Sequence, residues 1–410
     1  MLKMKQYIIL KQYNLIKINP SPEIWLKSMK VRIRMLKTLT SNIKHSLKRS
    51  GIIYHKFQLS KDSTRLFFFF NNENIQKAMN LIEKVFGIDS FSPALRTSDN
   101  LKNIIQRTLE VCKDILYKND TFAIRVKRSG KHDYTSQDVA KKVGQAVLDN
   151  FSYLNLKVNL SNPIKRIFIE VRGEFSYIFT DIIKSKWEGM PIERNNKIVC
   201  MDIGRLNDLL AGFLLMRRGC EIYPILFKLT YDNITLEKWI KNWREIIGYT
   251  PHSKFKIRVI NLLTILKRIQ DNLDDKEYLC AICRLLRFEI LSKILKELQI
   301  EDFERIKAIT DGISLNNSTS CTDIVDLESI SLNYLFSEYP IFTPLIGLET
   351  EVINDVSSKI SSNLSSLDYC LFKPQNQEIY RERLIEIYKS LNIQNLISEA
   401  LKNIEEINIT

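Results

Sequence analysis

The sequence has few of the features that mark secreted, membrane-spanning or zinc-dependent proteins. Its 410 residues include 4 histidines, which are scattered and form no His-x-x-x-His or His-Glu-x-x-His motif. The 7 cysteines are an odd number in a long chain, which argues against a disulfide framework. No apolar run approaches the roughly 18 residues of a membrane-spanning helix, and Tyr7–Leu10 is too short for the core of a signal peptide. We therefore expect a cytoplasmic protein with reduced thiols and no membrane partner.

Positive charge is abundant and unevenly distributed. The chain has 61 Lys and Arg against 47 Asp and Glu, a formal net charge of +14. Residues 1–200 carry 36 basic and 17 acidic residues, whereas residues 201–410 carry 25 and 30. A basic half beside a mildly acidic half predicts a polyanionic partner for the first half. A highly charged surface that serves only solubility is the alternative.

Hydrophobic periodicity predicts α+β structure in the first half. Helices are expected at 32–49 and 74–86 around a strand at 65–70. The same alternation continues beyond residue 86, with a strand at 121–127 and a helix at 136–150. We therefore expect two α+β parts, residues 1–85 and 86–190.

From residue 191 the pattern changes to that of a parallel sheet. A helix at 206–218 lies between short apolar strands at 198–201 and 221–226. Such a βαβ unit implies a sheet covered on both faces, so the fold class is α/β. This third part is expected to span residues 191–375 and to be followed by a helical tail, 376–410.

A group of cations surrounds the junction between the strand at 121–127 and the helix at 136–150. Alternation places Arg125 and Lys127 on one face of the strand. Thr135 or Ser136 can cap the helix, whose N-terminal amides and dipole favour an anion. These groups predict a phosphate-binding surface rather than a merely solvated loop. The candidate RNA-binding residues are Arg125, Lys127, Arg128, Lys131, His132, Lys141, Lys142 and, on a later strand, Arg172.

These residues carry a resemblance to a known family. Residues 122–150 resemble the signature of THUMP domains, and 162–177 resemble the second half of that module. Upstream, Glu23–Ser28 is similar to the ferredoxin-like domain that precedes THUMP in tRNA 4-thiouridine synthetases. Further matches in the family's order are Gly189–Pro191, Met216–Gly219 and Pro344–Leu348. The likeness covers roughly residues 15–375 and is greatest to the archaeal branch.

The resemblance implies a tRNA sulfurtransferase with a ferredoxin-like domain, a THUMP domain and a PP-loop domain of the adenine nucleotide alpha hydrolase type. In that family ATP adenylates a tRNA uridine before sulfur transfer, and the PP-loop Ser-Gly-Gly-x-Asp-Ser wraps the pyrophosphate. The matching stretch here, residues 203–208, keeps Gly204 but has Arg205, Asn207 and Asp208 at the altered positions. Arg205 would fill phosphate space, although it could also neutralise a phosphate. The loop therefore predicts either a changed ATP site or an ordinary turn between a strand and a helix.

Three cysteines form the remaining candidate site. Cys280 and Cys283 have the spacing of a ligand pair, and a distal thiol such as Cys370 could complete a metal site. In some archaeal members of the resembling family such cysteines hold an iron–sulfur cluster, so the resemblance implies a cluster and sulfur chemistry at Cys280 and Cys283. A redox-active or persulfide-carrying pair and buried core cysteines are the alternatives.

Three functions are consistent with these features. The first is ATP-dependent tRNA sulfur transfer, with tRNA as partner and a sulfur donor protein or sulfide as source. The second is a catalytically inactive relative that still binds tRNA. The third is a recruitment factor or structural subunit that reaches RNA through its basic half. A homodimer is compatible with all three.

Overall fold

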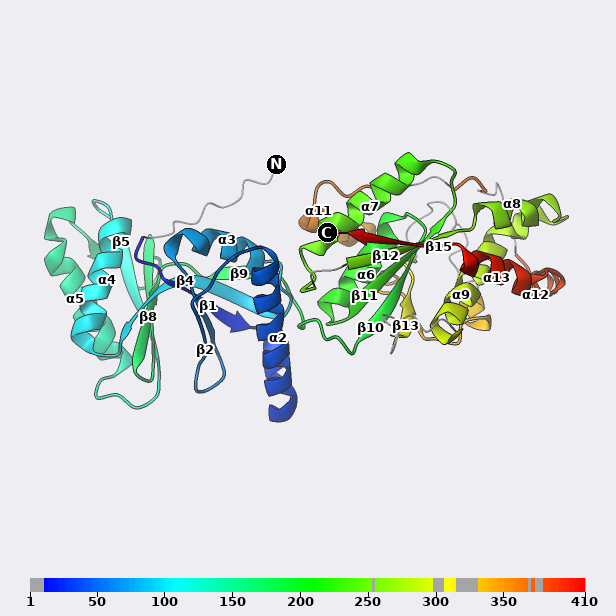
Figure 1. Cartoon of the computed structure of the whole chain (residues 1–410). Coiled ribbons are helices and arrows are strands. Elements are labelled where there is room, and N and C mark those ends of the chain that lie inside the picture. The colour runs from blue at the N-terminus through cyan, green and yellow to red at the C-terminus, as the bar shows by residue number, and fades with distance from the viewer. Residues whose placement is uncertain are drawn as a thin grey trace. The chain divides into compact units, whose positions relative to one another are not determined.

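The computed structural model describes residues 11–252, 255–297, 306–314, 331–367, 370–372 and 379–409. This part of the chain forms two compact units, and the division falls between Met190 and Pro191. Each unit consists of one β-sheet with helices packed on it (Figure 1). No described helix is both long and apolar enough to cross a membrane.

The first unit is built on one continuous sheet. Its strands are β1 Leu15–Pro20, β2 Lys56–Leu59, β3 Leu66–Phe69, β4 Ile88–Ser98, β5 Thr121–Ser129, β6 Lys157–Val158, β7 Lys165–Arg172, β8 Phe175–Phe179 and β9 Ile183–Glu188. The order is β2-β3-β1-β4-β8-β7-β5-β6, and β9 also pairs with β4. Because β4 pairs with β1 along its first half and with β8 along its second, this one strand joins the two predicted α+β parts.

The helices of the first unit bury amphipathic faces against this sheet. They are α1 Pro22–Trp25, α2 Met29–Arg49, α3 Asn72–Ile82, α4 Leu101–Ile115 and α5 Ser136–Asn150. In α2 the buried Leu39, Ile43 and Leu47 recur at helical spacing and enter the main core. Helix α5 starts at the predicted residue because Thr135 and Asp138 form a reciprocal capping box.

The second unit contains the predicted parallel sheet. Its strands are β10 Lys197–Asp202, β11 Glu221–Lys228, β12 Phe255–Asn261, β13 Ile306–Thr310, β14 Ile341–Phe342 and β15 Ile404–Ile409, in the order β14-β13-β10-β11-β12-β15. The helices are α6 Leu206–Arg217, α7 Asn233–Ile247, α8 Leu263–Asp271, α9 Leu279–Glu297, α11 Thr350–Ile360, α12 Arg381–Ser390 and α13 Ile393–Lys402. Strand β10 runs between β11 and β13, so the loop that follows it lies at the centre of the sheet's carboxyl edge.

The end of the chain differs from the predicted helical tail. Helices α12 and α13 are present, but residues 404–409 form β15, which pairs antiparallel with β12. The sequence Ile404-Glu-Glu-Ile-Asn-Ile409 continues the polar and apolar mixture of the preceding helices, so no local signal marks the change. The free edge of β12 supplies the pairing that turns this segment into a strand.

Candidate nucleic-acid interface and nucleotide loop

The predicted basic surface lies at the carboxyl end of β5 and the start of α5. Arg125, Lys127 and Arg128 are exposed on β5, Lys131 is exposed in the loop, and Lys141 and Lys142 are exposed on α5. No described carboxylate forms an ion pair with any of these six side chains. Their positive charge is therefore directed to solvent and can meet an anionic partner. Arg125 is held in place by donating to the carbonyl of Leu160.

Two other predicted RNA-binding residues have internal partners instead. The His132 side chain is 2% exposed, and its Nε2 bonds the Gly173 carbonyl at 2.8 Å. Gly130 has a φ of +109°, and a Cβ there would lie 3.3 Å from the His132 ring, so glycine suits this turn. Arg172 binds Glu170, Asp62 and Thr64. His132 and Arg172 thus hold the loop and its surroundings, and the proposal of direct RNA contact rests on the other six cations.

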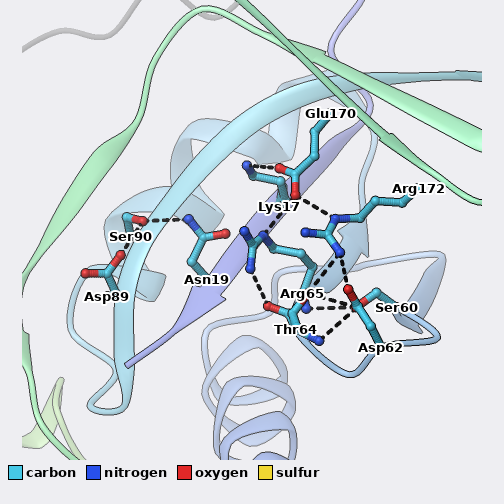
Figure 2. Close-up of polar contacts among 10 residues, drawn as sticks. All are labelled: Lys17, Asn19, Ser60, Asp62, Thr64, Arg65, Asp89, Ser90, Glu170 and Arg172. Atoms are coloured by element: carbon cyan, nitrogen blue, oxygen red, sulfur yellow. Dashed lines mark hydrogen bonds and ion pairs between the residues drawn. The ribbon is translucent and has the colours of Figure 1, made fainter. Parts of the chain in front are cut away.

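Arg172 belongs to an ion network that joins the two halves of the first unit (Figure 2). The Glu170 carboxylate on β7 accepts from Lys17 at 2.7 Å, from Arg65 at 3.1 Å and from Arg172 at 2.6 Å. Burial alone would raise the pKa of Glu170, but the three cations outweigh burial and hold it at about 2. Burial lowers the pKa of Lys17 to about 8 against the opposing effect of Glu170.

Sequence reasoning did not single out Lys17, Arg65 or Asp62 in this network. The available signal was a lysine between Ile16 and Ile18 in a predicted strand, because a buried lysine needs a carboxylate partner. The partner is 153 residues away in sequence, so its identity could come only from the fold.

In the second unit, the altered loop follows β10 and leads into α6. The Ile203 amide donates to Asp208 at 3.1 Å, and the Gly204 amide donates to Asp202 at 2.6 Å. Gly204 has a φ of +91°, which explains why this glycine is kept. Backbone amides that could face a phosphate are therefore bonded to carboxylates of the loop itself.

The Arg205 side chain lies within the site and is 10% exposed. Its guanidinium binds Asp208 at 2.5 Å and Asp311, after β13, at 3.3 Å. Arg284 on α9 binds the other oxygen of Asp311 at 3.0 Å. These two arginines and two aspartates form a nearly buried ion network at the carboxyl edge of the sheet.

Gly312 closes the same site from another direction. A Cβ at this position would lie 2.5 Å from the backbone nitrogen of Asp208, so the chain after β13 packs directly on the first turn of α6.

Asp202 is also buried and accepts from Trp239 at 2.5 Å and Trp243 at 2.9 Å. Burial and the neighbouring Asp208 carboxylate raise the pKa of Asp202 to about 7. Asn207, the fourth predicted nucleotide residue, lies in the turn that Gly312 covers. The residues present do not fit the pyrophosphate of a nucleotide, because their own side chains use the space and the amides.

The predicted cysteine site is only partly assembled. Cys280 and Cys283 lie one turn apart on α9, and the Cys280 thiol approaches the Phe372 carbonyl at 3.9 Å. Cys370 is two residues from Phe372, so all three cysteines lie in one region of the second unit. Among the described residues, no group of three His, Cys, Asp or Glu side chains is placed to hold a metal ion. Cys321, which the sequence left unassigned, falls outside the described residues.

The order of domains defines a class of protein. A ferredoxin-like half, a THUMP half that carries exposed cations and a parallel sheet with a PP-loop position form the architecture of a THUMP-containing tRNA-modification protein. Three family models match in the same order: the ThiI ferredoxin-like domain over residues 15–92, the THUMP domain over 98–181, and the thiamine biosynthesis protein (ThiI) over 195–383.

Similar proteins narrow this class to one family. A "probable tRNA sulfurtransferase" of Saccharolobus solfataricus is 30% identical over 397 residues, covering 96% of this chain and 99% of the relative. One from Saccharolobus islandicus is 28% identical over 403 residues, covering 96% and 100%. This chain belongs to the tRNA sulfurtransferase family. A solved structure described as a 4-thiouridine synthetase–RNA complex with bound ATP shares the fold, with a TM-score of 0.77 and 21% identity over 97% of this chain and 100% of that one.

Proposed function

We propose that this chain binds tRNA through the basic surface formed by the end of β5 and the start of α5. The observation that carries the proposal is the set of six exposed cations without ion-pair partners among the described residues. Lys131 precedes α5 and Lys141 and Lys142 lie on it, where backbone amides and the helix dipole add a further attraction for phosphate. Arg125 and Lys127 lie on the face of β5 that is turned away from α5. The THUMP match over residues 98–181 contains all six.

We further propose that the loop at 203–208 does not hold ATP as a PP-loop does. A solved structure with the same fold is described with bound ATP. In this chain, however, Arg205 lies between Asp208 and Asp311, and the Ile203 and Gly204 amides are bonded to carboxylates. ATP would have to break these contacts and bring its negative charge beside Asp208 and Asp311. Adenylation of a tRNA uridine by the family's route is therefore not expected.

Sulfur transfer remains the reaction of the family, and the cysteine pair is the group that could take part in it. Cys283 is 8% exposed and packs in the core of the second unit, whereas Cys280 is partly exposed at the start of α9. Cys280 is therefore the more accessible of the two thiols for a role in sulfur handling. A cluster with Cys370, a protein or sulfide donor, and a second copy of the chain stay predictions from the sequence.

The second candidate function is a tRNA-binding or recruitment protein without turnover. The loop at residues 203–208 favours this candidate, because its amides and Arg205 are bonded to carboxylates where a nucleotide would bind. The basic residues of the first unit, in contrast, remain exposed. This candidate and the family reaction share tRNA binding and differ in whether ATP binds.

One calorimetric experiment tests both parts. Titrating tRNA into the whole chain at low salt is expected to show binding, and adding millimolar ATP to the complex is expected to release no heat. Failure to bind tRNA at low salt would contradict the first proposal. Saturable heat with ATP would contradict the second and would restore the family's ATP-dependent reaction.

A further inference from the structure

A groove of about 440 Å³ lies between helix α2 and strand β2 of the first unit. Ile33, Leu36, Phe57 and Leu59 make its lining largely apolar, and no described Asp or Glu lines it. The groove is on the face of the sheet that α2 covers, because Phe57 packs against Phe68 in the main core on that side. Neither the proposed RNA surface nor the nucleotide loop involves any of these residues.

Strand β2 forms one edge of the first sheet, since β3 is the strand it pairs with among the described residues. The Ser60 amide donates to the Arg65 carbonyl at 2.9 Å. Because hydrogen-bonded and non-hydrogen-bonded pairs alternate along an antiparallel ladder, the backbone N–H and C=O groups of Phe57 and Leu59 point to the free edge. Such a row of groups is a template for a further strand. The side chains of the same two residues line the groove, so an added strand would lie along it.

Positive charge on α2 faces this groove without a counter-charge. Lys37 and Lys44 line it, and neither forms an ion pair with a described carboxylate. Helix α2 has seven Lys or Arg residues and no Asp or Glu. The two lysines are seven residues apart, about 10 Å along the helix axis at ~1.5 Å per residue. An extended peptide covers that distance with about three residues, so carboxylates on either side of a short apolar centre would meet both lysines.

The aromatic ring in the groove is not available for stacking against a nucleic-acid base. The Lys44 ammonium lies 4.7 Å from the centroid of the Phe57 ring, and the centroid of Phe68 is 4.9 Å from it. Single-stranded RNA needs open aromatic faces, whereas an apolar groove beside a free strand edge suits an extended peptide. The first ten residues of the chain itself do not suit the groove, because they include two lysines and no acidic residue.

We propose that this groove binds an extended, acidic segment of a partner protein, which pairs with the free edge of β2 as an added strand. The apolar side chains of that segment contact Ile33, Leu36 and Leu59, and its carboxylates lie at Lys37 and Lys44. The interaction does not depend on tRNA binding and adds a protein partner to the proposed RNA partner.

Fluorescence anisotropy of labelled seven-residue peptides, added to the whole chain at fixed salt, tests this inference. The first peptide has three valines between two pairs of glutamates, and the second has serines in place of the valines. The third is the valine peptide with N-methyl groups on the three valine amides, which removes N–H donors without changing charge. The first peptide is expected to bind about 10-fold more tightly than either of the others, because apolar burial and strand pairing both contribute.

Reversing the two lysines of the groove tests the role of charge. Lys37→Glu with Lys44→Glu is expected to lower the affinity for the valine peptide about 10-fold, since two ion pairs are replaced by repulsion. Lys30→Glu with Lys48→Glu is the matched control, because both lysines are exposed on α2 and do not line the groove. This control changes the net charge equally and is expected to lower the affinity by about 2-fold or less.

A further variant acts on the strand edge instead of the charge. Leu59→Pro removes an amide that points to the free edge and leaves the pairing with β3 in place, so a similar loss of about 10-fold is expected. Protection of the β1 amides from hydrogen exchange should be unchanged in this variant, which shows that the first unit is folded.

Equal binding of the three peptides, equal effects of the two lysine pairs, or full affinity in folded Leu59→Pro would overturn the inference. A loss of tRNA affinity of about 10-fold or more in Lys37→Glu with Lys44→Glu, but not in the control pair, would also overturn it, since the groove would then serve RNA. The peptide measurements contain no RNA, so their failure is distinct from a failure of the proposed tRNA binding.

Discussion

Reversing the charges of Lys127 and Lys131 together is expected to lower the affinity for tRNA by about 100-fold, because each lost charge-assisted contact contributes about 1.5 kcal/mol or more. The slope of log affinity against log salt should fall by about 2, one unit for each phosphate contact removed. Filter binding of tRNA across a salt series measures both quantities. Lys127 and Lys131 are chosen because they are exposed, whereas Arg128 also donates to the Gly130 carbonyl and helps to shape the loop.

The matched control reverses two lysines on the second unit. Lys238 and Lys241 are exposed on α7, so Lys238→Glu with Lys241→Glu changes the net charge by the same amount. This pair is expected to lower affinity by about 3-fold or less through long-range charge alone. If both pairs weaken binding equally, the chain attracts RNA by overall charge, and the basic surface at β5 and α5 has no special role.

Replacing Glu170 by Gln is expected to lower the free energy of unfolding of the first unit by about 3 kcal/mol, because three nearby cations lose their shared counter-charge. The lost interactions are buried within the first unit, since the Glu170 side chain is only 4% exposed. Hydrogen exchange of the β1 and β7 amides reports this unit separately from the other. Exchange there should accelerate, while β10 and β11 keep their protection.

The free energy of unfolding of the unaltered chain should depend on pH through the same carboxylate, Glu170. The pKa of Glu170 is lowered from 4.5 to about 2 in the folded chain, so its contribution is complete above about pH 4.5 and is lost as pH falls toward 2. Glu170→Gln should remove this part of the acid sensitivity. Glu110→Gln is the control, because Glu110 and Arg107 form an exposed pair whose loss is expected to cost less than about 1 kcal/mol. Equal effects of the two substitutions would show that the network in Figure 2 does not hold the halves together.

Local sequence signals explain the elements that could be predicted. Helix α5 was expected at its observed bounds, because the Thr135 and Asp138 cap and the apolar spacing lie within one short segment. The strands around α6 were likewise expected, since a βαβ unit is a local pattern. Strand β4 was not expected, because its continuity depends on pairing with β1 and β8 from two different parts of the chain.

The candidate sites show the same division between local and distant information. The sequence indicated that Arg205 would occupy phosphate space, but it could not indicate that the guanidinium turns to Asp311, 106 residues away. It placed His132 and Arg172 among the RNA contacts because both side chains can donate hydrogen bonds to phosphate and belong to the matched THUMP segment. Their partners Gly173 and Asp62 come from other strands and turns, so their internal roles became visible only in the fold.

The proposal that residues 203–208 do not hold ATP bears on which part of the family's activity this chain keeps. A loop that wraps a pyrophosphate offers free backbone amides and small side chains at a helix N-terminus. Here Arg205 pairs with Asp208 and Asp311, and Arg284 pairs with Asp311, at the place where a nucleotide phosphate would lie in a PP-loop. Binding of tRNA is the activity that the described residues support most strongly.

Lysine footprinting with and without tRNA tests this central claim most directly. The chain is acetylated briefly at low salt, and the modification at each lysine is measured by mass spectrometry. The account predicts that tRNA protects Lys127, Lys131, Lys141 and Lys142 while Lys238 and Lys241 react as before. Unchanged reactivity at the first four lysines, with tRNA bound, would contradict it.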